Sequence, residues 1–236
     1  MSASFDLSRL FVRQYERNDN KLLQFHQCEV GDVGCVVWDA ALVLSKYLET
    51  ADFNYGHALI SKVIVELGAG TGAVGLVAAS FGARVTITDL PEFIPLLEYN
   101  IQANRSSIAG NIHAHPLIWG IQTMKDIPRE PDYILLADCI YYEESLEPLV
   151  STISSLCGKQ TEVLCCYEKR NSGKKPELEK RFFELIHSSF DVEEIPQERQ
   201  DQHFCSDDIH IFKFQMERNH GMLKSKVPQQ LSHFTH

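Results

Sequence analysis

The sequence predicts an α/β protein built on a doubly wound, mostly parallel sheet of seven strands, preceded by a β-hairpin and a helix. First, short apolar runs alternate with helical patterns from residue 62 to residue 214, which is typical of parallel strands joined by covering helices. Second, a glycine-rich turn follows the first of these runs and opens a helix, as in sheets of this class. Third, 236 residues, of which 44% are hydrophobic, are enough to bury a full core.

The first predicted elements precede the sheet. Residues 10–16 and 21–28 alternate enough between apolar and polar side chains to form strands, and Asn18-Asp19-Asn20 favours a turn, so we expect a hairpin. Asp39 is expected to cap a helix, because its carboxylate can accept hydrogen bonds from the first backbone amides. The apolar face of that helix consists of Ala40, Val43, Leu44, Tyr47 and Leu48. Residues 50–61 are expected to form a loop.

The sheet and its helices follow. Apolar runs predict strands at residues 63–67, 84–88, 111–117, 133–137, 161–167, 190–195 and 208–214. Helices are expected at 72–81, which Gly82 ends, in a segment ending near Asn104, and at 145–156. Either Pro91 or Pro95 suits the first turn of the second of these helices. Pro176 opens a last helix with an apolar face of Leu178, Phe182, Leu185 and Ile186.

These elements predict one domain over residues 1–214, with the hairpin and helix at 10–50 and an α/β core at 62–214. Residues 215–236 are polar and lack a hydrophobic period, so we expect a disordered tail there. No internal repeat is visible in the sequence.

Composition narrows the possible partners. A net charge of −10 argues against a nucleic-acid backbone as the main partner and mildly favours a cationic substrate such as a lysine side chain, although acidity also serves solubility alone. The seven cysteines form no C-x-x-C pair, so no zinc or other metal site is expected. Several of them fall in apolar runs, which is typical of reduced thiols in the cytoplasm. No leader or membrane-spanning run is evident.

The stretch from Lys62 to Gly72 predicts a site for an adenosine cofactor. An apolar run ends in Glu66 and then turns through alternating glycines, which let the backbone turn tightly and let a ligand approach. Asp89 ends the next apolar run, where an acid is placed to bind the two hydroxyls of a ribose. A ligand-free turn from strand to helix is the alternative for any single loop of this kind.

Glu66 helps to choose between cofactors. Gly70, Gly72 and Gly75 also satisfy the G-x-G-x-x-G pattern of dinucleotide sites, so a nicotinamide-dependent oxidoreductase stays open. A carboxylate at the strand end would repel a pyrophosphate by a few kcal/mol. It suits the ammonium and sulfonium groups of S-adenosylmethionine instead, and we therefore expect that cofactor.

Asp138 and Tyr141 are candidate catalytic residues, because they follow the apolar run that ends at Ala137. Methyl transfer from a sulfonium requires the nucleophile in line with the methyl carbon, about 3 Å away. A carboxylate can orient a lysine amine, and an aromatic wall tolerates its cationic form. The alternative is that Asp138 caps the next helix while the tyrosines pack on it.

Two tryptophans are weaker candidates for the same site. Trp119 could stack against an adenine and Trp38 could close over the cofactor, although a lone tryptophan is more often part of a core. The segment from Tyr167 to Arg170 could line the substrate mouth, but a solvated rim is the preferred interpretation.

Three segments resemble the D-x-x-Y group of seven-strand protein-lysine methyltransferases. They are Glu66-Leu-Gly-Ala-Gly-Thr-Gly72, Asp138-Cys-Ile-Tyr141 and Val36-Val-Trp38-Asp39, and the resemblance covers roughly residues 10–214. It implies a class I methyltransferase fold, S-adenosylmethionine, and a protein lysine as substrate, with an AAA-type ATPase as the suggested partner.

The resemblance also implies roles for individual residues. Gly68, Ala69 and Gly70 would wrap the methionine part of the cofactor, and Asp89 would bind the ribose. Trp119 and Ala137 would border the adenine with Trp38 nearby, while Asp138 and Tyr141 would border the target lysine. A small-molecule methyltransferase and an inactive binding module remain alternatives, because the same sheet supports both.

Overall fold

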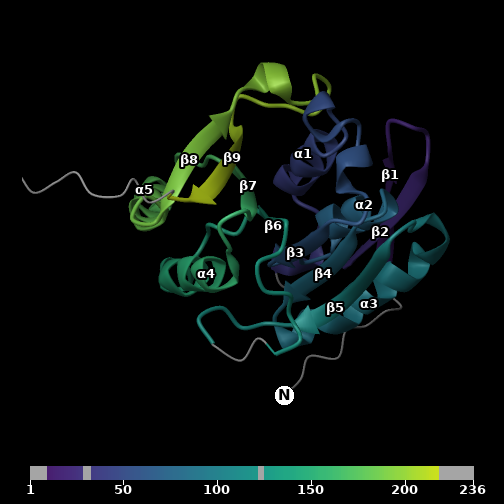
Figure 1. Cartoon of the computed structure of the whole chain (residues 1–236), viewed down its shortest axis with the longest axis horizontal. Helices are drawn as coiled ribbons and strands as arrows, with labels where there is room; N and C mark the ends of the chain where they lie inside the picture. The colour runs from purple at the N-terminus through teal and green to yellow at the C-terminus, as the bar shows by residue number, and fades with distance from the viewer. Residues whose placement is uncertain (1–9, 29–32, 122–124, 218–236) are drawn as a thin grey trace, which may run out of the picture.

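A hairpin and a seven-stranded sheet organise the chain, whose computed structural model describes residues 10–28, 33–121 and 125–217 (Figure 1). Strands β1 (Leu10–Glu16) and β2 (Leu22–Cys28) pair antiparallel, which confirms the predicted hairpin. The sheet has the order β5-β4-β3-β6-β7-β9-β8. Its strands are β3 (Val63–Leu67), β4 (Arg84–Asp89), β5 (Asn111–Pro116), β6 (Tyr133–Ala137), β7 (Glu162–Glu168), β8 (Phe190–Ile195) and β9 (Ile209–Met216).

The direction of the strands confirms a mostly parallel, doubly wound sheet. Strands β3 to β7 pair parallel, whereas β9 lies antiparallel between β7 and β8. The chain runs outward from β3 through β4 to β5 and then returns to β6 on the other side of β3. Ligands in such sheets bind beyond the carboxyl ends of the strands, at the place where the strand order reverses. That place here lies between β3 and β6.

Five α-helices connect the strands. They are α1 (Asp39–Tyr47), α2 (Ala73–Ser80), α3 (Ile94–Ala103), α4 (Glu143–Leu156) and α5 (Lys175–Ile186). Short 3₁₀ turns lie at Val33–Cys35, Ala51–Phe53, His57–Leu59, Pro91–Phe93, Arg105–Ser107 and Gln197–Arg199. Two of these turns fall within the segment 50–61 that was expected to be a loop.

Two helix starts differ from prediction, and the structure resolves a third that was left open. Trp38 holds the N-cap position of α1 and Asp39 is its first helical residue, so the predicted Asp39 cap is wrong. Both candidate prolines are used before Asn104, because Pro91 opens a 3₁₀ turn and Pro95 lies in the first turn of α3. Helix α4 begins at Glu143, two residues before the predicted start.

Alternate residues of the central strands face two separate apolar layers. Ile64 of β3 and Leu135 of β6 pack with residues of α1 and α2, whereas Val65 and Leu136 pack with residues of α4 and α5. The helices therefore cover both faces of the sheet (Figure 1). Burial on both faces explains why these strands are continuous apolar runs in the sequence.

Two asparagines of α3 and the residue after it hold the hairpin on the core. The side chain of Asn104 accepts a hydrogen bond from the Gln24 amide and donates one to the Gln24 carbonyl, each at 2.7 Å. Asn100 bonds both backbone groups of His26, at 2.7 and 3.0 Å, and also donates to the Thr71 carbonyl at 2.9 Å. The two amides thus pair with the outer edge of β2 as a neighbouring strand would.

The C-terminal boundary lies beyond the predicted one. Strand β9 continues to Met216. Gln215 and Met216, the first two residues of the predicted tail, pair with Asp191 and Phe190 of β8 and therefore belong to the sheet. The remainder of the predicted tail, from residue 218, lies outside the described residues. Within the ranges that the structure describes, no helix is long and apolar enough to cross a bilayer.

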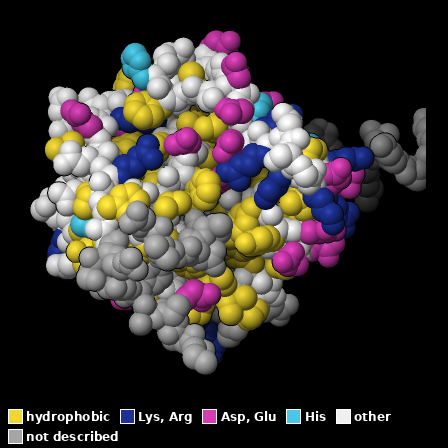
Figure 2. Space-filling model, turned by 180° about the vertical axis from the view of Figure 1, so that it is seen from behind, with side chains coloured by type: hydrophobic (Ala, Val, Ile, Leu, Met, Phe, Trp, Pro, Cys, Tyr) yellow, Lys and Arg dark blue, Asp and Glu magenta, His cyan; other side chains and the backbone are white. Residues whose placement is uncertain are grey.

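The surface is not uniformly acidic despite the net charge of −10. Figure 2 shows hydrophobic side chains and Lys and Arg side chains gathered next to one another near the middle of one face. A mixed apolar and charged face of this kind is suited to contact with another molecule.

Candidate active site

A cavity of about 460 Å³ opens where the strand order reverses. Its walls come from the loops after β3, β4, β5 and β6 and from the segment before α1, with further residues from the segment after β7 and from α4 and α5. It brings together all of the residues that the sequence singled out, namely Trp38, Glu66, Gly68, Ala69, Gly70, Asp89, Trp119, Ala137, Asp138 and Tyr141. Its volume lies within the range of about 300–1,000 Å³ that is usual for small-molecule and cofactor sites.

The glycine loop after β3 requires glycine at Gly70 for two reasons. Its φ of +56° is in the left-handed region that side chains disfavour. A Cβ atom there would lie 2.8 Å from the Gly34 carbonyl oxygen, since the segment before α1 passes directly over the loop. The loop ends at Gly72, the N-cap of α2, so the first amides of that helix lie beside the cavity.

Asp89 connects the end of β4 with this loop. Its Oδ2 atom accepts a hydrogen bond from the Gly70 amide and Oδ1 accepts one from the Leu90 amide, both at 2.7 Å. The carboxylate lies at the carboxyl end of β4 and lines the cavity. Asp89 therefore has the position of a ribose-binding acid.

Glu66 is buried beneath the loop, with 2% of its surface exposed. Its Oε2 atom accepts a hydrogen bond of 2.9 Å from the Gly75 amide in the first turn of α2. Burial raises the pKa of Glu66 to about 8, against the opposing effect of the Gly75 amide and with a further contribution from the charge of Asp89. A cationic ligand in the cavity would favour the ionised form of this buried acid.

Trp119 packs beside the glycine loop. A Cβ atom on Gly68 would lie 3.0 Å from the Trp119 ring and 2.8 Å from Cys139 Sγ, so the ring and the loop are in close contact. Trp38 also lines the cavity, and 39% of its surface is exposed.

The cavity wall also contains apolar residues. Leu117 and Ile118 belong to the strand end 116–119, where the sequence predicts ligand binding, whereas Leu90 and Phe93 after β4 were missed. Their position shortly after a predicted strand was the signal that could have identified Leu90 and Phe93, because such strand ends meet at one edge of the sheet.

Asp138 begins the opposite side of the cavity, just after β6. Its φ of +55° is uncommon for a residue with a side chain, although aspartate tolerates it better than most. Oδ2 accepts a hydrogen bond of 2.7 Å from Arg170 Nη2, and Oδ1 accepts a longer one of 3.3 Å from the Glu168 amide. The N-cap of α4 is Tyr142, so the alternative in which Asp138 caps that helix is wrong.

Two opposing effects act on the pKa of Asp138. Burial raises the pKa above its usual value, and the charge of Arg170 opposes that rise.

The segment from Tyr167 to Arg170 was expected to be a solvated rim. That interpretation is wrong for both ends of the segment, because Tyr167 is buried and Arg170 lines the cavity.

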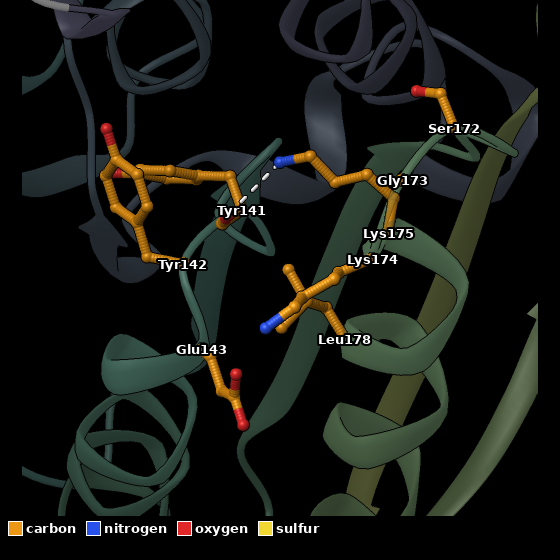
Figure 3. Close-up of a pocket in the computed structure, with 8 residues that line it drawn as sticks. All are labelled: Tyr141, Tyr142, Glu143, Ser172, Gly173, Lys174, Lys175 and Leu178. Carbon is orange, nitrogen blue, oxygen red and sulfur yellow. Dashed lines mark hydrogen bonds between the residues drawn. The ribbon is translucent and has the colours of Figure 1, made fainter.

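A second groove of about 330 Å³ adjoins the cavity and shares Tyr141, Tyr142 and Lys175 with it. The two tyrosine rings lie side by side, with their centroids 4.6 Å apart, and Lys175 Nζ donates to the Tyr141 carbonyl at 3.0 Å (Figure 3). Lys174 and Glu143 come from the starts of the two helices that border the groove, α5 and α4 (Figure 3). A polypeptide segment entering the cavity from this side would pass between them.

The chemistry available in the cavity is that of acids, aromatic rings and backbone amides. Among the residues that the structure describes, no group of three or more histidine, cysteine or acidic side chains gathers as metal ligands would. The expectation that the site uses no metal stays a prediction.

Comparisons with known proteins place the chain among methyltransferases. A family model described as lysine methyltransferase matches residues 17–189. Protein-lysine methyltransferase METTL21E of Bos taurus is 41% identical over 166 residues, which are 69% of this chain and 55% of that protein. Protein N-lysine methyltransferase METTL21A of Mus musculus is 37% identical over 185 residues, which are 78% of each chain.

A solved structure gives the same fold. The 16S rRNA N2 G1207 methyltransferase of T. thermophilus, in complex with AdoMet and guanosine, matches with a TM-score of 0.58 and 16% identity over 89% of this chain and 51% of that one. At this identity the match shows the fold alone. The chain spans 55 to 65% of the length of the METTL21E relatives that it matches.

Proposed function

The chain belongs to the lysine methyltransferase family, and on that premise we propose that it is an S-adenosylmethionine-dependent protein N-lysine methyltransferase. The observation that carries the proposal is the single cavity at the switch in strand order, which gathers all ten residues selected from the sequence. Such a coincidence is unexpected for a ligand-free turn, because these residues come from five separate segments of the chain.

The residues of the cavity fit the cofactor chemically. The buried Glu66 and the amides at the start of α2 surround a place suited to the ammonium and carboxylate of a methionine group. Asp89 lines the cavity at the end of β4, where a carboxylate can bind ribose hydroxyls, and Leu90, Ile118 and Trp119 offer an apolar wall to an adenine. S-adenosylmethionine supplies an electrophilic methyl group on a positively charged sulfur when it is bound.

Asp138 and Tyr141 are proposed to receive the target lysine. The Asp138 carboxylate accepts an N–H of the amine and orients its lone pair, and the Tyr141 ring borders the methylene groups and the cationic form. The half-exposed Tyr142 extends this aromatic surface toward solvent, beside the second groove.

The finer identity of the substrate rests on the sequence motifs. The segments 34–40, 44–50 and 137–148 resemble the enzyme that methylates valosin-containing protein, so we propose an AAA-type ATPase as the protein substrate. We further propose a cytoplasmic location, since the cysteines are mostly buried thiols of the kind found in reducing compartments.

Labelled S-adenosylmethionine tests this function. The purified chain is incubated with the labelled cofactor and a heat-treated cell extract, and labelled proteins are identified by mass spectrometry. We expect label on lysine of a discrete protein, with little label when Asp138→Asn replaces the wild type. Cofactor binding without any protein label would overturn the proposed activity, and binding of NAD in preference to S-adenosylmethionine would favour the oxidoreductase.

A further inference from the structure

Arg170 brings a fixed positive charge to the side of the cavity that holds the proposed lysine-binding residues. Its Nη2 atom lies 2.7 Å from Asp138 Oδ2 and 2.7 Å from Glu168 Oε2, and Nε donates to the same Glu168 oxygen at 3.1 Å. Its Cζ atom lies 5.3 Å from the centroid of the Trp38 ring. Two carboxylates and an aromatic ring thus fix one guanidinium, whose side chain is 27% exposed.

We infer that Arg170 is a positioning residue of the acceptor site: it holds the Asp138 carboxylate in place for the incoming lysine amine and favours the neutral, reactive form of that amine. This inference rests on the proposed function. Arg170 acts on the target lysine amine through Asp138 and does not contact the methyl group.

The first step of the argument is the geometry of Asp138. Only 8% of its side chain is exposed, and its backbone holds an uncommon left-handed conformation. A buried carboxylate needs partners to remain ionised, and a planar guanidinium fixes the orientation of a carboxylate better than an ammonium does. Without Arg170, Asp138 would keep the longer hydrogen bond of 3.3 Å from the Glu168 amide.

The second step is the remaining capacity of that carboxylate. Arg170 and the Glu168 amide use two of about four acceptor positions, so a lysine N–H can still be accepted. Oδ2 already accepts the short bond from Arg170, whereas Oδ1 accepts only the longer bond from the Glu168 amide. Oδ1 is therefore the oxygen better placed to accept an N–H of the lysine amine.

The third step is the charge felt by the amine. A lysine nitrogen that reaches Asp138 comes close to a guanidinium that is already paired with that carboxylate. A nearby like charge disfavours the protonated amine, whereas the methyl acceptor must be the neutral form. Arg170 therefore offsets the tendency of Asp138 to keep the lysine protonated.

Among the described residues, two charged groups and three thiols interact with Asp138. Glu168 ends β7 and Arg170 follows it, the thiols of Cys165 and Cys166 lie within that strand, and Cys139 follows Asp138 directly. Burial raises the pKa of all three thiols, so they stay neutral across the accessible pH range. The balance between Arg170 and Glu168 accordingly controls the charge at Asp138.

The first measurement reads Asp138 directly, without turnover. The carboxyl carbon of Asp138 is followed by NMR as pH is varied, in protein labelled at aspartate and with Asp138→Asn to assign the signal. In Arg170→Met, which removes the charge at similar length, Asp138 should titrate at higher pH than in the wild type. Arg170→Lys keeps the positive charge, so Asp138 should titrate in it at a pH between those of the wild type and Arg170→Met. Unchanged titration in Arg170→Met would overturn the inference.

The second measurement follows methyl transfer to heat-treated extract protein from labelled S-adenosylmethionine across pH. Arg170→Met should be slower than the wild type by about tenfold near pH 7 and by about twofold near pH 9.5, where Asp138 is ionised in both proteins and a larger share of the lysine is neutral. A ratio independent of pH would assign Arg170 a merely structural role and overturn the inference.

Two controls separate the possible failures. Arg181→Met removes an exposed arginine that pairs with Glu147 away from the cavity, and it should leave the pH profile unchanged. The affinity for S-adenosylmethionine, measured by calorimetry, should change less than about threefold in Arg170→Met, and a larger loss would move Arg170 to the cofactor site. A wild-type protein that labels nothing would overturn the proposed function itself, whereas an active wild type with unchanged Asp138 titration in Arg170→Met overturns this inference alone.

Discussion

The two sides of the cavity are held by different interactions. At the ends of β3 and β4, carboxylates accept hydrogen bonds from backbone amides: the buried Glu66 from Gly75, and the partly buried Asp89 from Gly70. At the ends of β6 and β7, Asp138 is held by the side chain of Arg170, and Tyr142 stands half-exposed beside it. Backbone bonds fix the first side whatever molecule is present, whereas the second side depends on charges that a substrate can alter.

The two sides of the cavity therefore require different kinds of residues. The cofactor side needs small residues where chain segments approach closely, and the acceptor side needs a balance of charge. Changes on the first side should therefore appear as lost cofactor affinity, and changes on the second side as lost methyl transfer.

Replacing Gly70 should have the largest effect. In Gly70→Ala the new Cβ meets the Gly34 carbonyl oxygen at 2.8 Å in a left-handed backbone, so loop and overlying segment must separate. We expect affinity for S-adenosylmethionine to fall more than about a hundredfold, as measured by calorimetry. Gly173→Ala is the matched control, because Gly173 has a similar φ of +60° but no atom within 4 Å of the added Cβ. Equal affinities for the two variants would contradict the steric argument.

Asp138→Asn should separate transfer from binding. The substitution nearly keeps the volume of the side chain but removes the charge that orients the amine and pairs with Arg170. Misplacing the amine should lower methyl incorporation about a hundredfold, with cofactor affinity nearly unchanged. Asp191→Asn, on the exposed surface of β8, serves as control. A large loss of cofactor affinity would instead place Asp138 among the cofactor-binding residues.

Asp89→Ala should weaken S-adenosylmethionine by about ten- to a hundredfold, because bonds to a charged acceptor contribute about 1.5–3 kcal/mol. The same loss should appear with adenosine, which contains the ribose but no methionine group. If adenosine affinity were unchanged in a folded variant, the ribose assignment would fail, and the loss for the whole cofactor would reflect only the missing support to the Gly70 amide.

Glu66→Gln should have the smallest effect and should depend on pH. The folded protein raises the pKa of Glu66 from 4.5 to about 8, so between these values the folded state binds more protons than the unfolded state. Wild-type stability should therefore fall as pH rises through this window, and the variant should not show that fall. Near pH 9 we expect Glu66→Gln to be more stable by about 1–2 kcal/mol in urea unfolding, and near pH 5 similar to wild type. A difference that is constant with pH would contradict the assignment.

Local patterns predicted most of the fold. The seven strands and five helices follow from hydrophobic periodicity, and the boundaries differ by a few residues. The start of α4 was predicted late because Glu143 and Glu144 are exposed acids that carry no hydrophobic signal. The placement of β9 between β7 and β8 was not predicted, since strand order depends on packing between distant segments.

The candidate site divides in the same way. Residues near the glycine loop were found because spacing along the chain determines their position at the strand ends. Arg170 was set aside because a charged run after a strand usually faces solvent, and its partner Asp138 lies 32 residues earlier in the sequence. A contact between two strand ends can be expected from topology, but the pairing of one arginine with one aspartate depends on side-chain conformations.

The asparagines that hold the hairpin have a consequence for the order in which the chain is made. Their bonds to β2 join residues 74 and 80 positions apart, so the hairpin emerges from a ribosome well before Asn100 and Asn104 do. Until then the outer backbone groups of β2 have no strand-like partner, and an open strand edge is where a second chain can add. The edge of β2 can thus be covered only after α3 and Asn104 have been made, and a fragment that stops before residue 100 lacks both asparagines.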